Sequence, residues 1–278
     1  MTARAQTDSE GAPGATGAPE AAHAERRFVF VVGHAFCGST LLGRMLNSHP
    51  ALFCPGEMLR IQDAFEDGYP CSCDAPLDTC PFWTTRLPLI NQAARHNYRK
   101  TTLADYDRLR RHEQARALVD TSKTRIYRLR RTLCRPRETA VIHLVRDLRG
   151  VLASHLRRGH DFRARLATTV KWAARFERLQ RTLKDRAVHV FYEDLVESPE
   201  STLRALCVFI GVPYDAALLT PSRAEHHFIH ASISPYLRGT DKLSKDERWK
   251  EELSPDQINE TERAMRKSQI LRDRYLEG

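Results

Sequence analysis

The stretch Phe28-Val-Phe-Val-Val-Gly-His-Ala-Phe-Cys-Gly-Ser-Thr-Leu-Leu42 decides the fold of this chain. Residues 28–32 are all aromatic or β-branched, which predicts a short buried strand. Two glycines then bracket a tight loop, and residues 41–46 have the apolar spacing of a helix. A strand, a glycine loop and a helix in this order point backbone N–H groups at one spot over a helix N-terminus, where a phosphate or sulfate group binds well.

The loop spacing is close to that of a nucleotide-binding P-loop, in which a lysine follows the second glycine. Gly33 and Gly38 fit the glycine positions and Thr40 fits the hydroxyl position, but Ser39 stands where the lysine would be. A kinase or an ATPase needs that lysine on the β- and γ-phosphates, so binding of an ordinary nucleoside triphosphate is disfavoured. The alternative without a ligand is a glycine turn that only packs the helix against the sheet.

The composition fits a globular protein with an anionic partner. The 278 residues suit one α/β domain or two small ones, and 41% hydrophobic residues are enough for a sizeable core. The formal net charge of +9 favours nucleic acid, an anionic lipid or a phosphorylated cofactor as a partner. The basic residues are spread through the predicted helices, so solvated helix faces explain the charge equally well.

The N-terminal residues 1–26 are rich in Ala, Gly and Pro and contain no apolar signal core. We therefore expect a disordered tail over 1–26 and a folded domain over 27–278. No apolar run reaches the ~18 residues that a membrane span needs. These features predict a cytoplasmic protein without a membrane span.

The chain has seven cysteines, of which Cys71, Cys73 and Cys80 lie close together in sequence. A closed zinc site needs four ligands, usually in Cys-x2–4-Cys pairs, and Cys-x-Cys is tight for that pattern. The fourth ligand would have to be Cys54 or a histidine. A disulfide is disfavoured in the cytoplasm. We therefore expect buried free thiols in a loop and no metal.

Strand and helix patterns alternate along the chain. Further strands are predicted over 51–56, 117–123, 140–145 and 187–192, and the main helices over 83–115, 124–135, 148–158, 162–184, 198–210 and 255–275. This alternation predicts a central parallel sheet with helices on both faces. Ligands of such sheets bind outside the carboxyl ends of the strands, and four polar positions lie at those ends, namely Gly38, Lys123, Arg146 and Tyr192.

Two of these segments resemble motifs of the sulfotransferases that use 3′-phosphoadenosine 5′-phosphosulfate (PAPS). The glycine loop resembles that family's 5′-phosphosulfate loop, commonly Arg-Ser-Gly-[Ser/Thr]-Thr-Leu-Leu. Arg146, with Ser154 eight residues later, resembles the 3′-phosphate motif, and Arg158 matches a second arginine of the tyrosylprotein branch. The first two motifs together are specific to the family.

Weaker likenesses extend the resemblance from about Phe28 to Trp249. Tyr192 begins a Tyr-Glu-Asp-Leu segment that resembles the one placing a tyrosine beside the adenosine. Arg248, together with Arg238, resembles a late loop that folds over the cofactor. Residues 71–83 and 119–123 resemble bacterial members of the family.

The resemblance implies a three-layer P-loop-like α/β fold and transfer of a sulfuryl group from PAPS to a hydroxyl or amine acceptor without a metal. Loop amides suit the phosphosulfate, and an arginine fork suits the 3′-phosphate that ATP lacks. The cofactor-binding residues that it implies are Phe36, Cys37, Gly38, Ser39, Thr40, Leu41, Arg146, Ser154, Arg158, Tyr192, Arg238 and Arg248.

One loop position departs from the family pattern. Phe36 stands where the family usually carries Arg or Lys, a cation that steadies the charge on the bridging oxygen as the sulfuryl group leaves, and Cys37 replaces a serine. Without that cation, the loop amides, Thr40 and Lys123 have to stabilise this charge. A protein that binds PAPS without turnover is therefore one alternative, and a P-loop kinase-like protein is another.

Glu57 is the predicted general base, because its His49-Pro50…Gly56-Glu57 context is similar to that of a glutamate in the tyrosylprotein branch. The alternative is a glutamate that caps a turn. Lys123 is the second predicted catalytic residue, and its alternative is a surface lysine. In-line sulfuryl transfer needs positioning, charge stabilisation and a base for the acceptor, as phosphoryl transfer does.

The expected partner is a small-molecule, lipid, carbohydrate or peptide hydroxyl acceptor. A nucleic-acid module built on the basic helix at 124–135 is the alternative from the binding class. Nucleic-acid surfaces usually interleave basic and aromatic side chains, and Tyr127 is the single aromatic residue of that helix. We therefore expect no nucleic-acid partner.

Overall fold

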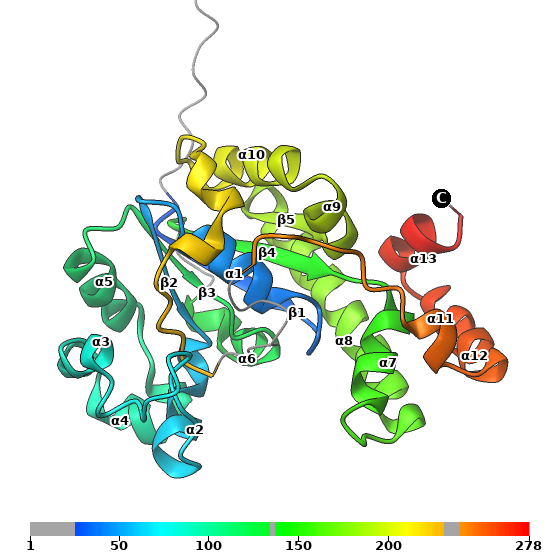
Figure 1. Ribbon diagram of the computed structural model, residues 1–278, viewed down its shortest axis with the longest axis horizontal. Coiled ribbons are helices and arrows are strands. Elements are labelled where there is room, and N and C mark those ends of the chain that lie inside the picture. The colour runs from blue at the N-terminus through cyan, green and yellow to red at the C-terminus, as the bar shows by residue number, and fades with distance from the viewer. Residues whose placement is uncertain (1–25, 134–136, 231–239, 278) are drawn as a thin grey trace, which may run out of the picture.

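The computed structural model describes residues 26–133, 137–230 and 240–277. The tail predicted over 1–26 falls almost wholly outside the described residues, as does Arg238. The described chain forms a five-stranded parallel sheet in the order β2-β3-β1-β4-β5, with helices on both faces (Figure 1). This confirms the predicted fold class. The strands are β1 (Phe28–Gly33), β2 (Leu52–Gly56), β3 (Ala117–Asp120), β4 (Thr139–Val145) and β5 (Ala187–Phe191).

The central strand β1 is buried along its whole length, as its continuous apolar sequence predicts. It pairs with β3 on one side and β4 on the other, with Val29 opposite Val119 and Val31 opposite Ile142. Alternate side chains of β1 therefore point to the two faces of the sheet. The glycine loop follows β1 directly, so it opens at the carboxyl edge of the sheet.

Three helices cover one face of the sheet, where Val29 and Val31 pack into their apolar cluster. They are α1 (Ser39–Asn47), α9 (Tyr192–Glu197) and α10 (Pro199–Ile210), which lie together in Figure 1. Helix α10 begins at Pro199 and ends at Ile210. Gly211 follows it with a left-handed φ of 88°, which a glycine adopts easily after the last helical turn. Helix α1 starts directly after the glycine loop, so this layer fixes the loop against the sheet.

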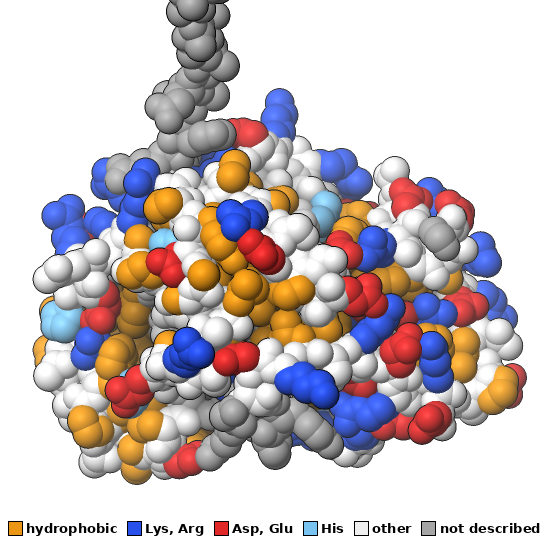
Figure 2. Space-filling view, turned by 45° about the horizontal axis from the view of Figure 1, so that its top comes forward, with side chains coloured by type: hydrophobic (Ala, Val, Ile, Leu, Met, Phe, Trp, Pro, Cys, Tyr) orange, Lys and Arg blue, Asp and Glu red, His pale blue; other side chains and the backbone are white. Residues whose placement is uncertain are grey.

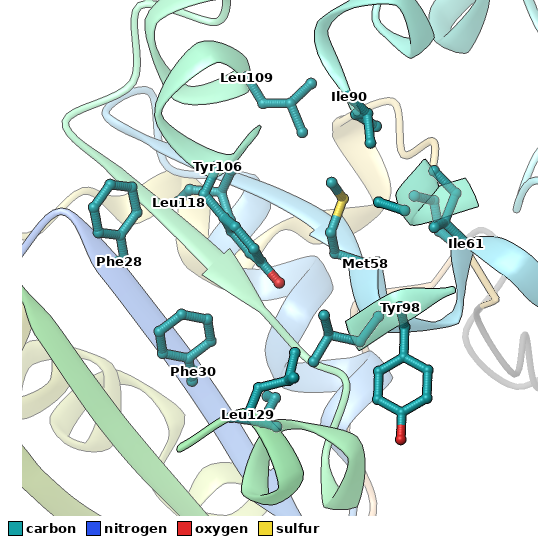
Figure 3. Close-up of a cluster of buried hydrophobic side chains, with 14 of the residues drawn as sticks. Phe28, Phe30, Met58, Ile61, Ile90, Tyr98, Tyr106, Leu109, Leu118 and Leu129 are labelled. Carbon is teal, nitrogen blue, oxygen red and sulfur yellow. The ribbon is translucent and has the colours of Figure 1, made fainter. Parts of the chain in front are cut away.

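The opposite face packs a larger cluster around Phe28 and Phe30. Figure 3 shows these rings beside Tyr106 and Leu118, and the Tyr106 ring lies edge-on to both phenylalanines. The helices of this layer are α2 (Ile61–Glu66), α3 (Pro81–Thr84), α4 (Gln92–His96), α5 (Leu103–His112), α6 (Thr124–Leu133) and α8 (Phe162–Leu183).

The region predicted as one helical stretch over 83–115 is broken into short pieces, so that prediction was wrong in detail. Asn91 and Asn97 each cap a new turn with their side-chain oxygen, and Thr102 forms a capping box with Asp105 at the start of α5. Such residues stabilise helix starts rather than helix interiors. Short 3₁₀ helices join the pieces here and elsewhere, namely η1 (Met58–Arg60), η2 (Leu87–Leu89), η3 (Tyr98–Lys100), η4 (Lys184–Arg186), η5 (Ala216–Leu219) and η6 (Pro221–Arg223).

The C-terminal part of the chain packs against α7 (Leu148–Leu156) and α8. It contains α11 (Trp249–Glu252), α12 (Pro255–Met265) and α13 (Gln269–Tyr275), which lie together at one end of the molecule in Figure 1. The single helix predicted over 255–275 is therefore divided. Ser268 divides it, because its hydroxyl accepts a hydrogen bond from the N–H of Leu271 and caps a new helix.

No helix among the described residues is long and apolar enough to cross a membrane. On the face that Figure 2 shows, Lys and Arg side chains are interspersed with Asp and Glu. Two arginines of the basic helix α6 are also engaged inside the protein. Arg125 pairs with Asp63, and Arg128 donates to the Tyr98 hydroxyl at 3.2 Å.

Candidate functional site

A cleft of about 830 Å³ lies at the carboxyl edge of the sheet. Of the predicted site residues that the structure describes, all line it except Cys37. The ends of all five strands contribute residues to it, because parallel strands end at one edge, and Arg248 comes from a further segment. The predicted residues that line the cleft are Phe36, Gly38, Ser39, Thr40, Leu41, Glu57, Lys123, Arg146, Ser154, Arg158, Tyr192 and Arg248.

The glycine loop ends at Gly38, whose φ of 95° is left-handed. A Cβ added at Gly38 would lie 2.5 Å from Cδ2 of Tyr192, so a glycine is needed here for space as well as for conformation. No side chain in the described ranges caps α1, which begins at Ser39. Its first-turn N–H groups therefore face the cleft with the positive end of the helix dipole, the arrangement that favours an anion.

Arg146 lies directly after β4 and is buried. It donates to the carbonyl of Phe36 at 2.7 Å, and its guanidinium lies over the Tyr192 ring at 4.4 Å. Gly150 gives it room, because a Cβ there would lie 3.3 Å from the guanidinium. Arg146 thus joins the glycine loop to the tyrosine that follows β5, and these contacts hold the guanidinium in one orientation.

Asp246 lies among three arginines at this end of the cleft. Arg146 donates to it at 3.0 Å, Arg248 donates to it at 2.7 and 2.8 Å, and Arg157 lies 3.8 Å away. Arg157 also donates to the hydroxyl of Ser154 at 2.8 Å. Hydrogen bonds from Arg248 and Arg146 hold the pKa of Asp246 well below its usual range. The cluster is therefore a preformed site for a negatively charged group.

Asp246 and Arg157 were missed by the sequence analysis. Arg157 lies between two predicted residues of the same helical segment, and the helical position of Ser154 could have indicated it, since side chains three apart are neighbours. Asp246 lies in an irregular segment far along the chain, where no local pattern marks it. Arg158 lines the cleft from the same turn, with its guanidinium 5.8 Å from the centre of the Phe36 ring.

The two predicted catalytic residues meet in an ion pair. Glu57 follows β2, Lys123 follows β3, and the lysine ammonium donates to Oε1 of the glutamate. Both side chains are largely buried, with exposed fractions of 7% for Glu57 and 14% for Lys123. Because both side chains are largely buried, removing either one would leave a buried charge without its partner. Glu57 stands at the N-cap position of η1, but its side chain makes no capping hydrogen bond, and Lys123 is too buried for a surface lysine; the catalytic roles of both stay predictions.

The backbone around Lys123 is fixed by buried polar groups. Its φ of 53° is unusual for a residue with a side chain, and its N–H donates to the carbonyl of Val31. Asp120, at the end of β3, accepts from the N–H of Ser122 at 2.7 Å and from the Tyr106 hydroxyl. Burial outweighs these hydrogen bonds and raises the pKa of Asp120 to about 6. These hydrogen bonds fix the backbone that places Lys123 beside Glu57.

A second wall of the cleft, beside Glu57, was not predicted. Arg60 lies 4.0 Å from the Glu57 carboxylate, and Tyr69 stacks on His230 with ring centres 3.9 Å apart. All three of these additional residues line the cleft. Burial lowers the pKa of His230, so it is neutral near pH 7. The wall offers an aromatic surface and a cation next to a buried carboxylate.

Cys37, a predicted cofactor-binding residue, does not line the cleft. Cys37 is fully buried, and its thiol packs under the loop, where a Cβ added at Gly33 would lie 2.8 Å from its sulfur. Its side chain therefore supports the loop from below and does not reach a ligand. Arg238 lies outside the described residues. Phe36 lines the cleft with a left-handed φ of 64°, and its ring packs edge-on against His155.

Comparison with known proteins places this geometry in a family. A family model described as "Sulfotransferase family" matches residues 29–216. A search of curated proteins found no match. Two of the solved structures that resemble the chain are sulfotransferase domains from the curacin biosynthetic pathway and from the Synechococcus PCC 7002 olefin synthase. Each is 23% identical, with TM-scores of 0.64 and 0.56, covering 87% and 88% of this chain and 96% of each domain.

A mammalian structure also shares the fold. The mouse sulfotransferase SULT7A1, crystallised in complex with PAP, is 13% identical and has a TM-score of 0.53. The match covers 89% of this chain and 88% of the mouse protein. At these identities the likeness shows a common fold, and the family model carries the assignment.

Proposed function

Because this chain belongs to the sulfotransferase family, we propose that it transfers a sulfuryl group from PAPS to a hydroxyl or amine acceptor. The observation that carries the proposal is the presence of two anion sites in one cleft. The uncapped first turn of α1 presents its N–H groups at one of them, and Arg146, Arg157 and Arg248 surround the other. A donor with a phosphosulfate at one end and a 3′-phosphate at the other needs two such sites.

The second anion site supports PAPS over ATP. Three arginines converge on a carboxylate there, so a 3′-phosphate placed in the same position would receive charged hydrogen bonds from a fork that is already oriented. ATP has no 3′-phosphate to use these groups. PAP in the related mouse structure supports the same donor class. The Tyr192 ring, held between Gly38 and Arg146, is proposed to contact the adenosine side.

The proposed reaction is an in-line displacement. PAPS, when bound, supplies an activated sulfuryl group whose transfer leaves PAP. Glu57 accepts the proton of the acceptor hydroxyl as the new S–O bond forms, and the proton ends on its carboxylate. Before the proton moves, Lys123 would exchange its hydrogen bond with Glu57 for hydrogen bonds with the sulfuryl oxygens of bound PAPS, which frees the base and stabilises the transferring charge. The N–H groups of the loop stabilise the leaving bridging oxygen.

The wall formed by Arg60, Tyr69 and His230 is proposed to bind the acceptor, since it lies beside Glu57 and away from the arginine cluster. A stacked aromatic pair favours an acceptor with an apolar or ring-containing body. We propose a small-molecule acceptor of this kind.

Binding of PAPS without turnover is the second candidate function, and Phe36 favours it. This residue replaces the loop cation of the family pattern, and its carbonyl accepts from Arg146. A screen that incubates the protein with PAPS and a mixed set of phenols, alcohols and amines distinguishes the two functions. Formation of PAP together with a sulfated product supports sulfotransfer. PAP binding without product from any acceptor class supports the degenerate alternative.

A further inference from the structure

Three cysteines and one histidine meet outside the cleft. The ligand atoms of Cys71, Cys73, Cys80 and His227 all lie within 4.8 Å of one another. Cys73 Sγ lies 3.6 Å from Cys80 Sγ, and His227 Nδ1 lies 3.6 Å from Cys71 Sγ and 3.4 Å from Cys80 Sγ. Cys54, the other cysteine that the sequence analysis considered, is not part of the cluster. The cluster does not take part in the proposed sulfotransfer chemistry.

The spacing matches one tetrahedral zinc ion. Zn–S bonds of about 2.3 Å and Zn–N bonds of about 2.0–2.1 Å at tetrahedral angles separate two sulfurs by about 3.8 Å and a sulfur from a nitrogen by about 3.6 Å. Three of the six separations in the cluster agree with these values within about 0.2 Å, and all six are within 4.8 Å. Two sulfurs in a disulfide would instead lie about 2.05 Å apart. The four side chains therefore converge on a common centre rather than on each other in pairs.

The backbone brings the four ligands together independently of any metal. Cys71 and Cys73 share a tight turn, in which the N–H of Asp74 donates to the carbonyl of Cys71. Cys80 is the N-cap of α3, and the neighbouring Trp83 donates its indole N–H to the carbonyl of His227 at 2.9 Å. The three cysteines lie close together in sequence, but His227 lies 147 residues after Cys80, so the local turn geometry alone does not explain the convergence.

The strand-like segment that carries His227 is also paired to the first cysteine turn. Ser72 donates its hydroxyl to the carbonyl of His226 at 2.7 Å, and the N–H of Phe228 donates to the Ser72 hydroxyl at 2.8 Å. Ile229, two residues beyond the histidine, bridges to both Cys71 and Gly56. The cluster is thus connected through backbone hydrogen bonds to the end of β2, next to Glu57.

The histidine has the partner that a metal ligand usually has. His227 Nε2 lies 2.7 Å from Oε1 of Glu225. Donation from Nε2–H to that carboxylate places the free lone pair on Nδ1, the atom that faces the cysteines. The ring also stacks on Phe82, with ring centres 4.6 Å apart and planes 4° from parallel. Its orientation is therefore fixed by a carboxylate and an aromatic ring, as in carboxylate–histidine–zinc arrangements.

We propose that Cys71, Cys73, Cys80 and His227 bind one structural zinc ion. Three thiolates and an imidazole suit zinc, and four protein ligands close its coordination sphere, which is typical of a structural site rather than a catalytic one. Cys71 and Cys80 are buried, and Cys73 is exposed, so an ion can reach the cluster from solvent.

The ion would stabilise the acceptor wall of the cleft. Tyr69 lies two residues before Cys71, and His230 lies three residues after His227. The ring stack of Tyr69 on His230 therefore joins the two segments that the zinc ion would link. The glycine loop and Arg146 belong to other segments, so PAP binding should not depend on the ion.

Metal analysis of the purified full chain tests the proposal directly. The expected result is about one zinc per chain in the parent protein and in Cys207→Ala, whose buried thiol lies on α10 outside the cluster. Cys80→Ser should lose the metal. Cobalt(II) added to the metal-free parent should give the intense sulfur-to-cobalt charge-transfer bands and the d–d bands of a tetrahedral site, and Cys80→Ser should give neither.

A second variant covers the case in which Cys80→Ser fails to fold. Glu225→Gln keeps all four ligands and removes only the carboxylate that orients His227, and it should weaken zinc affinity by roughly 10- to 100-fold in chelator competition. Glu200→Gln, an exposed carboxylate that pairs with Arg204 on α10, should leave the affinity unchanged. A parent protein that binds neither zinc nor cobalt would overturn the proposal, as would a Cys73–Cys80 disulfide in protein purified without oxidant. None of these readouts depends on sulfotransferase activity.

Discussion

Arg146 donates a hydrogen bond to Asp246 at 3.0 Å, across 100 residues of sequence, at the end of the cleft where the 3′-phosphate of PAPS is proposed to bind. Arg248 holds the same carboxylate with two further hydrogen bonds. A carboxylate of the protein thus occupies a position that suits a phosphate. The donor has to compete with Asp246 for these arginines, and this competition can be measured.

Asp246→Asn is expected to tighten the binding of adenosine 3′,5′-bisphosphate several-fold to about tenfold, since the incoming phosphate no longer displaces a charged partner. Isothermal titration of the variant and the parent gives the ratio. Glu260→Gln on α12 removes an exposed carboxylate that lies 3.8 Å from Arg163 and should change nothing. Weaker binding by Asp246→Asn would show instead that Asp246 orients the arginines for the ligand.

Glu57→Gln keeps the size of the side chain and removes the basic charge, so it is expected to lower kcat by about 10²- to 10⁴-fold on a poorly acidic alcohol. The affinity for adenosine 3′,5′-bisphosphate should stay near that of the parent, because Glu57 lies beside the acceptor wall. The defect should shrink for acidic phenols, which lose their proton more easily. A parent-like rate on the alcohol would remove Glu57 from the role of base.

Lys123→Met separates charge stabilisation from proton transfer. It is expected to slow turnover by a similar factor for alcohols and phenols, since the lysine acts on the transferring group whatever the acidity of the acceptor. Removing the ammonium leaves Glu57 buried without its partner, so thermal unfolding should be measured alongside. A defect that varies with acceptor acidity, as for Glu57→Gln, would assign Lys123 to the proton-transfer step.

The fold is expected to lose stability in mild acid. Burial, with a contribution from the charge of His155, lowers the pKa of His34 to about 4, and burial together with His189 and His34 lowers the pKa of His143 well below its usual value. The unfolded chain therefore binds more protons than the folded one below about pH 6.5. The free energy of unfolding keeps the full contribution of these two histidines above that pH and decreases as the pH falls below it. His34 should cost about 1.5 kcal/mol between pH 6.5 and 5, and His143 should add to the loss in the same direction.

Urea unfolding at pH 7 and pH 5 measures this loss. His143→Leu should reduce it, because it removes one titrating group and the unpartnered buried Nδ1 of that ring. Equal pH dependence in the parent and His143→Leu would contradict the assignment.

The sequence predicted the sheet and much of the site because those signals are local. Apolar runs mark the strands, and the residues directly after them, such as Glu57, Arg146 and Tyr192, have to meet at the carboxyl edge of a parallel sheet. Glu57 meets Lys123 because β2 and β3 are neighbours in the sheet. The sequence analysis did not predict the order of the strands.

Some site residues that the sequence analysis missed lie in segments without the hydrophobic periodicity of a helix or a strand. Asp246 and His230 lie in irregular stretches, where position is set by contacts with distant parts of the chain. The same is true of His227, which completes the cysteine cluster from far along the sequence. Local turn signals indicated three of the four proposed zinc ligands, and only the fold identifies the fourth. Cys37 shows the reverse error, because a loop motif does not tell which side chains point into the core.

Isothermal titration with adenosine 3′,5′-bisphosphate and with ATP, on the parent and on Arg146→Ala, tests the central claim most directly. The account predicts that the bisphosphate binds much more tightly than ATP, and that Arg146→Ala loses about tenfold to a hundredfold in bisphosphate affinity, as a charged hydrogen bond of about 1.5–3 kcal/mol implies, with little change for ATP. Equal affinities for the two nucleotides, or an unchanged bisphosphate affinity in a folded Arg146→Ala variant, would contradict it.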